Sequence, residues 1–419
     1  MKIKYYNLLC ILFLPWTIVF ILRALGPINY QPISASFLLF LFIFLILGAA
    51  GYIFGFSGIG SGRKRAARYE RNNLDFEFKL VLFLSLMYTA LTFADFFVLK
   101  GGTLSTITLV REEDNLVGSR MSLLGGLIAI TSAAPFVLLC KIRHERIISN
   151  QPIGVFIIFF AIIGIATSFL SGGRNGFLIG IVVYFVQGLQ LKKGLEFKLQ
   201  KKNNKVRLFI SIVILLGILF SFYLFVNREL NQGVDVNQLL SVFAVKWSVQ
   251  IDEIQTDNIF FGSIYAATTI FVFYLTHALN FIDQYFIEGV SPSLMGAYNF
   301  PIPSKIIDVL SGSNISSSTS GDLLVPGVYL TLPGSLYIDY GYFGATVFGF
   351  LIGAATGFAY RLSMRKTFLQ LQLASFMICF WLLAPLYSVI GISNGFSFLT
   401  IIFLLLALKS IMKMKLHVN

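Results

Sequence analysis

Repeated apolar runs, each long enough to cross a bilayer, constrain the fold of this chain more than any other feature. A membrane-spanning helix needs about 17–25 mostly apolar residues, and runs of that length recur along the whole sequence. Of the 419 residues, 57% are hydrophobic and only 12% are charged, a composition that soluble domains of this length do not have. The sequence therefore predicts an all-α, polytopic integral membrane protein with a single transmembrane domain over residues 1–419.

The polar breaks between the apolar runs predict about ten transmembrane helices. The first run follows two lysines, as in a signal peptide, but it lacks a small-residue cleavage site, so we expect it to be retained as a helix. The three cysteines are widely separated, which favours neither a disulfide framework nor a metal site. The predicted helices span residues 6–25, 35–57, 79–98, 121–140, 152–170, 176–191, 208–226, 336–360, 368–390 and 396–409.

The charged residues between these helices divide strongly between the two sides of the membrane. Of the 32 Lys and Arg residues, 24 fall on one side together with only five of the 19 acidic residues. The positive-inside rule makes that side cytoplasmic and places both termini there. Contact with anionic lipid explains these basic loops better than nucleic acid does. Eight basic residues on the outer side are left without a topological reason, namely Arg23, Lys100, Arg111, Arg120, Arg174, Arg228, Lys246 and Lys305.

The longest connection, residues 227–334, is predicted to be a large outer loop on the periplasmic or extracytoplasmic side. Connections of this length are usually functional. Its apolar stretch, residues 260–286, is long enough to span the membrane, but one crossing there would invert the last three helices and move their basic residues outside. We therefore expect interfacial or re-entrant helices in this stretch.

The SGGRNG turn at residues 171–176 joins two predicted helices and carries one arginine, Arg174, next to Gly172 and Gly173. One interpretation is that Arg174 anchors the hairpin at the lipid headgroups. The other is that the glycine N–H groups and the following helix N-terminus converge on an anion, which the arginine also binds. The glycines favour a phosphate or pyrophosphate site, because an anchor does not need bare backbone.

Four other charged residues leave the same choice open. Arg111 and Arg120 bracket the acidic segment VREEDNLVGSR, which is either a surface ion-pair cluster or a group that binds phosphate and sugar. Arg228 and Glu229, at the end of a predicted helix, allow the same two interpretations.

His277 is the one histidine predicted on the outer side, where it is either a structural hydrogen-bonding residue or a general base. Asp339, in the segment SLYIDYGYFG, either caps a helix or faces a cavity. In such a cavity Tyr337, Tyr340 and Tyr342 would suit a sugar ring.

The sequence has no HExxH, paired CxxC, Walker or DxD pattern, and no GxGxxG after a strand. We therefore expect no metal and no cofactor. The absence of these motifs disfavours ATP-driven transport and transfer from a nucleotide sugar. It leaves a substrate that a lipid phosphate already activates.

These features together resemble the bacterial O-antigen or oligosaccharide repeat-unit polymerases (Wzy type) and, more distantly, the O-antigen ligases. The resemblance covers the topology of the whole chain, but in residues mainly 171–176 and 337–344 (YIDYGYFG). It implies a glycosyltransferase of the bacterial inner membrane. This enzyme would join undecaprenyl-pyrophosphate-linked repeat units into O-antigen or capsule-type polysaccharide on the outer face.

The resemblance also implies roles for the candidate residues and rivals for the function. Membrane lipid, a chain-length regulator and a flippase would be partners, whereas nucleic acid would not. The rival functions are a flippase or transporter of lipid-linked oligosaccharide and an O-antigen ligase. The general base would be His277, Asp339 or Glu229, sugar binding would involve Tyr337 and Tyr340, and pyrophosphate would be bound by Arg174, Arg111, Arg120, Arg228, Gly172 and Gly173.

Overall fold

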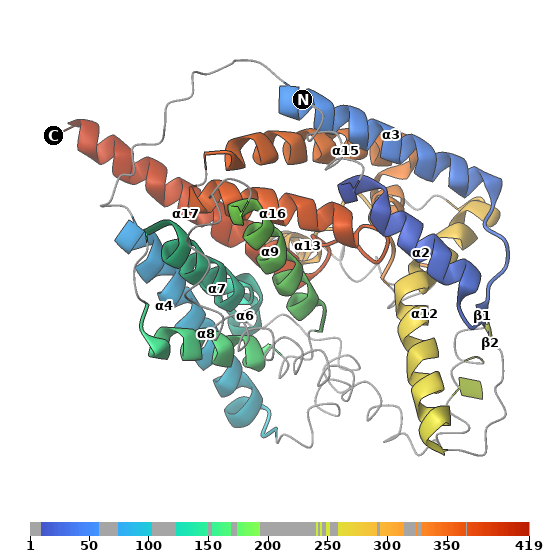
Figure 1. Ribbon diagram of the computed structural model, residues 1–419, viewed down its shortest axis with the longest axis horizontal. Coiled ribbons are helices and arrows are strands. Elements are labelled where there is room, and N and C mark those ends of the chain that lie inside the picture. The colour runs from blue at the N-terminus through green and yellow to red at the C-terminus, as the bar shows by residue number, and fades with distance from the viewer. Residues whose placement is uncertain are drawn as a thin grey trace. The chain divides into compact units, whose positions relative to one another are not determined.

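In the computed structural model, nearly all the secondary structure of the described residues is helical (Figure 1). The chain divides into two compact units. Unit 1 comprises Met1–Tyr52, Ile218–Gly353 and Phe380–Ser388, and unit 2 comprises Ile53–Gly217, Ala354–Cys379 and Val389–Asn419. The structure describes residues 10–57, 74–102, 123–149, 153–168, 174–192, 240–241, 244, 249–251, 259–290, 294–313, 323–324, 329–365 and 367–418.

The described residues form these elements. Unit 1 contains α2 (Leu14–Leu25), most of α3 (Ala35–Ser57), α12 (Ile259–Ile287), α13 (Pro301–Ser311), the first part of α15 (Leu332–Ser363), and β1 (Ile28–Asn29) paired antiparallel with β2 (Gln250–Ile251). Unit 2 contains α4 (Leu74–Phe93) with its π-helical extension η1 (Ala94–Leu99), α6 (Leu123–Thr131), α7 (Ala134–His144) with its extension η3 (Glu145–Ser149), α8 (Val155–Thr167), α9 (Arg174–Lys192), most of α16 (Phe368–Leu383) and α17 (Ser393–Val418).

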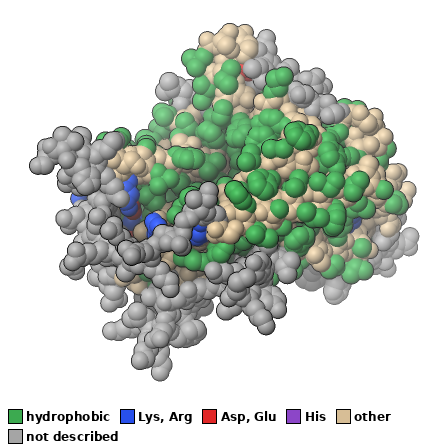
Figure 2. Space-filling view, turned by 90° about the horizontal axis from the view of Figure 1, so that it is seen from above, with side chains coloured by type: hydrophobic (Ala, Val, Ile, Leu, Met, Phe, Trp, Pro, Cys, Tyr) green, Lys and Arg blue, Asp and Glu red, His purple; other side chains and the backbone are tan. Residues whose placement is uncertain are grey.

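The structure confirms an all-α, multi-pass membrane protein. Five helical segments among the described residues are long and apolar enough to cross a membrane: Ala35–Ser57, Phe76–Leu99, Leu124–Ile148, Leu332–Ser363 and Ser393–Ile411. Hydrophobic side chains cover much of the described surface in Figure 2, as expected for a protein that lies in lipid.

Helices occupy the predicted spans that fall among the described residues, although their ends differ. The predicted span 208–226 lies outside those residues, so the total of ten crossings stays a prediction. The apolar stretch 260–286 forms a single continuous helix, α12. Its polar residues Thr276, His277 and Asp283 are buried, which matches a polar seam that faces protein.

Close backbone packing joins α3 and α15 within unit 1. A side chain at Gly353 would collide with the carbonyl oxygen of Gly48, and one at Gly48 would collide with the ring of Trp381. Gly349 lies one turn before Gly353 on α15, and a side chain there would collide with the ring of Phe44. The two glycines therefore form a groove on α15 into which α3 packs. Small residues serve the same purpose in many membrane proteins, where lipid supplies no hydrophobic drive for helices to associate.

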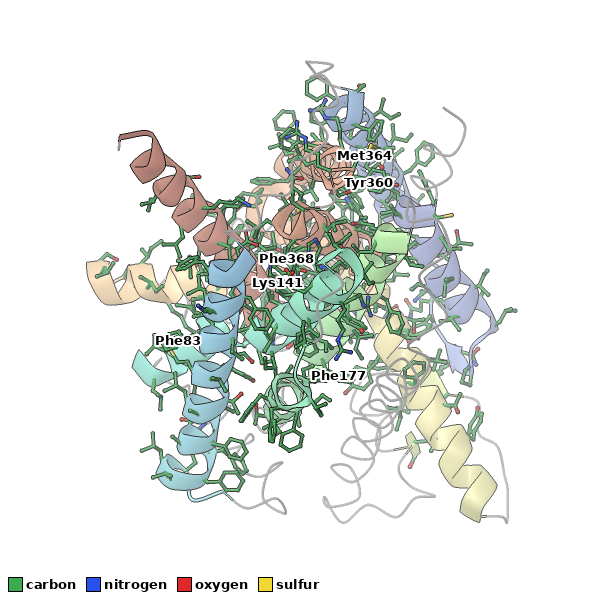
Figure 3. The ribbon with its side chains drawn as sticks, turned by 60° about the vertical axis from the view of Figure 1, so that its left-hand side comes forward. Phe83, Lys141, Phe177, Tyr360, Met364 and Phe368 are labelled. Atoms are coloured by element: carbon green, nitrogen blue, oxygen red, sulfur yellow. The ribbon has the colours of Figure 1, made fainter. Side chains whose placement is uncertain are left out.

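Buried charged side chains form a network within unit 2. The Nζ atom of Lys141 is 3.0 Å from a carboxylate oxygen of Glu77 and 3.0 Å from one of Glu145, and it lies over the ring of Phe368 (Figure 3). Lys409 pairs with the other oxygen of Glu77 at 3.2 Å. The four charged residues come from three separate helical segments, and the structure brings them into one network.

Candidate functional site

A break in α15 determines the surroundings of Asp339. Gly341, two residues later, has φ 67° and ψ −173°, which interrupts the helix. The carbonyl groups of Ile338 and Asp339 therefore lack the backbone N–H donors that a regular helix would supply four residues later. They accept hydrogen bonds instead from the N–H groups of Leu294 (3.2 Å) and Met295 (3.0 Å). The break thus attaches the turn at residues 294–299 to α15.

The carboxylate of Asp339 holds the same turn. It accepts hydrogen bonds from the backbone N–H groups of Tyr298 (3.0 Å) and Asn299 (2.9 Å) and from the side-chain amide of Asn299 (2.7 Å). The amide oxygen of Asn299 in turn accepts from the hydroxyls of Ser335 (3.0 Å) and Ser388 (2.6 Å). This buried network, which we call the Asp339 cluster, connects three separate segments of unit 1.

The position of Asp339 differs from the one that the sequence suggested. The helix was expected to begin at residue 336, close enough for Asp339 to act as its cap, but α15 begins at Leu332. The carboxylate therefore does not cap α15, because it binds the N–H groups of another segment. Asn299 and Ser388 were missed, since both lie far from Asp339 in sequence and no local pattern marks them.

We expect replacement of Asp339 by alanine to lower the free energy of unfolding by about 2–3 kcal/mol, because it leaves buried donors without an acceptor. Asp339→Asn should cost less, since it keeps the shape and one oxygen. Thermal unfolding of the purified protein in detergent measures both changes. Equal melting temperatures for wild type and Asp339→Ala would show that the cluster is not structural.

The break at Gly341 should not tolerate a side chain. Its backbone conformation is one that glycine alone adopts readily, so Gly341→Ala is expected to cost about 1–3 kcal/mol. Gly154→Ala is the matched control, because a methyl group there meets no atom within 4 Å and the backbone has φ −56°. Melting temperatures compare the two variants, and equal shifts would rule out strain at Gly341.

The two predicted sugar-binding tyrosines have different surroundings. Tyr337 is only 7% exposed, stacks on Phe286 at 4.5 Å and donates its hydroxyl to the carbonyl of Val290 (3.2 Å). It belongs to the core of unit 1, so a sugar contact would need Phe286 to move. Tyr340 is half-buried and stacks on Phe348 at 4.5 Å, which leaves part of its surface accessible.

His277 lies on α12 and is buried. Its Nδ1 is 3.0 Å from the carbonyl oxygen of Phe273, and its ring stacks on the ring of Phe273 at 5.0 Å. Within unit 1, no hydrogen bond or ion pair joins His277 to Asp339 among the described residues.

Arg174 is the first residue of α9, so the predicted helix start after the glycine turn is present. A side chain at Gly176, in the same first turn, would collide with Asn394, the second residue of α17. Two helices of unit 2 thus begin against each other. Each N-terminus carries a partial positive charge and N–H groups without helical partners, so their meeting point attracts an anion.

The contribution of α17 to this meeting point was missed in the sequence. The triplet Asn-Gly-Phe occurs at residues 175–177 and again at 394–396, and each copy lies in the first turn of a helix of unit 2. This short repeat is the signal that could have drawn attention to Asn394.

The remaining candidates lie outside the described residues, and their roles stay predictions. In the described part of the chain, no group of three or more His, Cys, Asp or Glu side chains could hold a metal ion. The candidates outside it are Arg111, Arg120, Gly172, Gly173, Arg228 and Glu229.

The fold by itself defines the class, which is an all-α, multi-pass membrane protein. No protein-family model matches the chain, and neither a curated protein nor a solved structure matches it. A function for this chain therefore rests on the chemistry of its own residues.

Proposed function

We propose that the protein is a glycosyltransferase that polymerises lipid-linked oligosaccharide repeat units. Its substrate would be an undecaprenyl-pyrophosphate-linked glycan on the outer face of the bacterial inner membrane. The observation that supports this most directly is the meeting of the α9 and α17 N-termini beside Arg174. An arginine at the first position of a helix whose N-terminus meets that of a second helix suits a group with two adjacent phosphates.

The proposed reaction transfers a glycan from one lipid carrier to another glycan. A hydroxyl oxygen of the acceptor attacks the anomeric carbon of the donor and forms the new glycosidic bond. The bond from that carbon to the pyrophosphate oxygen breaks, and its electron pair leaves with undecaprenyl pyrophosphate. The proton of the acceptor hydroxyl passes to a base, for which His277, Asp339 and Glu229 are the candidates.

Arg174 would act by electrostatic stabilisation of the leaving group. Negative charge builds on the bridging oxygen as the carbon–oxygen bond breaks, and a fixed donor already aimed at that oxygen lowers the barrier. The helix N-termini would add to this effect, because their N–H groups are held by the helices and need no reorganisation.

Reconstitution into vesicles with a purified lipid-linked repeat unit tests the function. The expected result is longer glycan chains together with an equal amount of released undecaprenyl pyrophosphate. If the substrate only crosses the bilayer unchanged, the protein is a flippase or transporter. If chains are transferred only when a lipid A-core acceptor is added, it is a ligase. Either result would overturn the polymerase proposal.

A further inference from the structure

Helix α2 has an exposed apolar face and carries an arginine, Arg23, in its last turn. Leu14, Ile18, Ile21 and Leu25 recur on one side of α2 and are 48–83% exposed, whereas Trp16 on the other side is buried. This spacing is that of one helix face. Arg23 therefore lies where a helix that contacts lipid tails reaches the headgroups, on the side predicted to be outer.

The chain after α2 folds back as a fixed loop at residues 26–34. Its strand β1 pairs with β2. The hydroxyl of Tyr30 is 2.7 Å from that of Thr276 on α12. Ser34 donates its backbone N–H to both oxygens of Asp283 (3.2 and 3.1 Å), two turns further along the same helix. Attachment at these points makes the loop a preformed wall.

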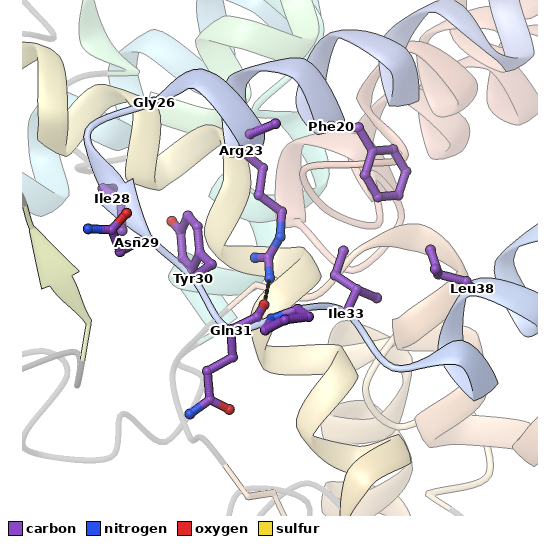
Figure 4. Close-up of a pocket in the computed structure, with 11 residues that line it drawn as sticks. Phe20, Arg23, Gly26, Ile28, Asn29, Tyr30, Gln31, Ile33 and Leu38 are labelled. Atoms are coloured by element: carbon purple, nitrogen blue, oxygen red, sulfur yellow. Dashed lines mark hydrogen bonds between the residues drawn. The ribbon is translucent and has the colours of Figure 1, made fainter.

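A cavity of about 440 Å³ lies between α2, this loop and the start of α3 (Figure 4). We call it the Arg23 cavity. One part of its lining is apolar and includes Phe20, Ile33 and Leu38. The other part includes Arg23 and Gln31, so charge and apolar surface meet in one site.

Arg23 is held in place but keeps unused binding capacity. One guanidinium nitrogen donates to the carbonyl of Gln31 (2.5 Å), and the guanidinium carbon is 4.4 Å from the centroid of the Tyr30 ring. The other terminal nitrogen is buried and has no hydrogen-bond partner. Asp283, the acidic residue that interacts electrostatically with Arg23, accepts hydrogen bonds from Ser34 and is not among the residues that line the cavity.

Tyr30 adds no negative charge to this site. Burial raises the pKa of its hydroxyl to about 12, so the group stays neutral at physiological pH. The charged side chain that lines the Arg23 cavity is therefore a guanidinium whose orientation is fixed by a carbonyl and an aromatic ring. A group that is anionic and accepts hydrogen bonds would complement this guanidinium.

We propose that the Arg23 cavity binds a phosphate group, supplied either by the headgroup of a membrane phospholipid or by a soluble phosphate ester. Arg23 binds the phosphate, and in the lipid case Phe20, Ile33 and Leu38 pack against the glycerol and the first methylene groups. This site belongs to unit 1 and does not depend on the proposed glycosyl transfer.

Native mass spectrometry of the full-length protein in a neutral detergent tests this proposal. The probes are phosphatidylglycerol, diacylglycerol, which has the same chains without phosphate, and glycerol 1-phosphate, which has the phosphate without chains. The expected result is that phosphatidylglycerol is retained and diacylglycerol is not. Arg23→Gln should weaken retention about tenfold, the effect of one hydrogen bond to a charged group.

Two further variants separate binding from folding. Leu38→Trp fills the cavity from its apolar side without removing Arg23, so it should also reduce retention while the melting temperature stays near that of wild type. Lys305→Gln removes another cation of unit 1 and should leave retention unchanged. Retention of glycerol 1-phosphate that depends on Arg23 would support a soluble ligand. Equal retention of phosphatidylglycerol by wild type and Arg23→Gln, or equal retention of diacylglycerol, would overturn the proposal.

Discussion

Replacing Lys141 by methionine is expected to lower the free energy of unfolding by about 3–5 kcal/mol. The side chain of Lys141 is fully buried, and those of its partners Glu77 and Glu145 are 7% exposed. Methionine matches the volume of the lysine stem but leaves two carboxylates close together without a positive charge between them. The thermal unfolding of the purified protein in detergent gives the size of the loss.

Lys409 provides the matched control. It pairs with Glu77 at 3.2 Å, but its side chain is 28% exposed, so Lys409→Met should cost less than about 1 kcal/mol. A second change checks the cause. Glu77→Gln in the Lys141→Met background removes one of the unpaired charges and should recover part of the lost stability. Equal losses for Lys141→Met and Lys409→Met would show that burial does not govern this network.

Arg174→Ala is expected to reduce glycan transfer in reconstituted vesicles by about 100- to 1,000-fold, the usual effect of removing one donor to a developing negative charge. Arg174→Lys should keep an intermediate activity, because it retains the charge and loses the planar pair of donors. The rate of chain elongation is measured at equal amounts of protein in the membrane.

Arg361→Ala controls for the loss of a cation from unit 2. Arg361 lies in the last turn of α15 over the ring of Phe358 (5.4 Å) and was predicted to be on the inner side. Its replacement should leave transfer unchanged. If Arg174→Ala transfers glycan as fast as wild type does, Arg174 is an anchor of the α8–α9 hairpin, and the pyrophosphate site must lie elsewhere.

The helices were predictable because their signal is local. A run of apolar residues such as 35–57 has one stable arrangement in lipid, where each backbone N–H and carbonyl must be bonded within its own helix. The break at Gly341 was not predictable, since glycine also occurs inside regular membrane helices, and the neighbouring turn at residues 294–299 supplies the hydrogen bonds that permit the break.

The candidate site shows the same division. Arg174 stands out in the sequence because glycines surround it and topology does not explain its charge. Its neighbour Asn394 does not stand out, because it is more than 200 positions from Arg174 in the sequence and lies in the first turn of an ordinary apolar helix. The cavity at Arg23 was also missed, since its walls depend on contacts from the loop at residues 26–34 to α12.

The sequence by itself determined the class of this protein and the grouping of its charges. The length of an apolar run decides whether that segment can cross the bilayer, and the Lys and Arg residues beside it favour one side of the membrane. Both effects depend on how a single segment interacts with lipid and water. Only the tertiary structure decided that Lys141 lies between Glu77 and Glu145, that Asp339 holds the turn at residues 294–299, and that α9 and α17 begin against each other. Apart from the pair Lys141–Glu145, which lies one helical turn apart, these contacts join residues far apart in the chain, so their energy depends on packing that no local pattern records.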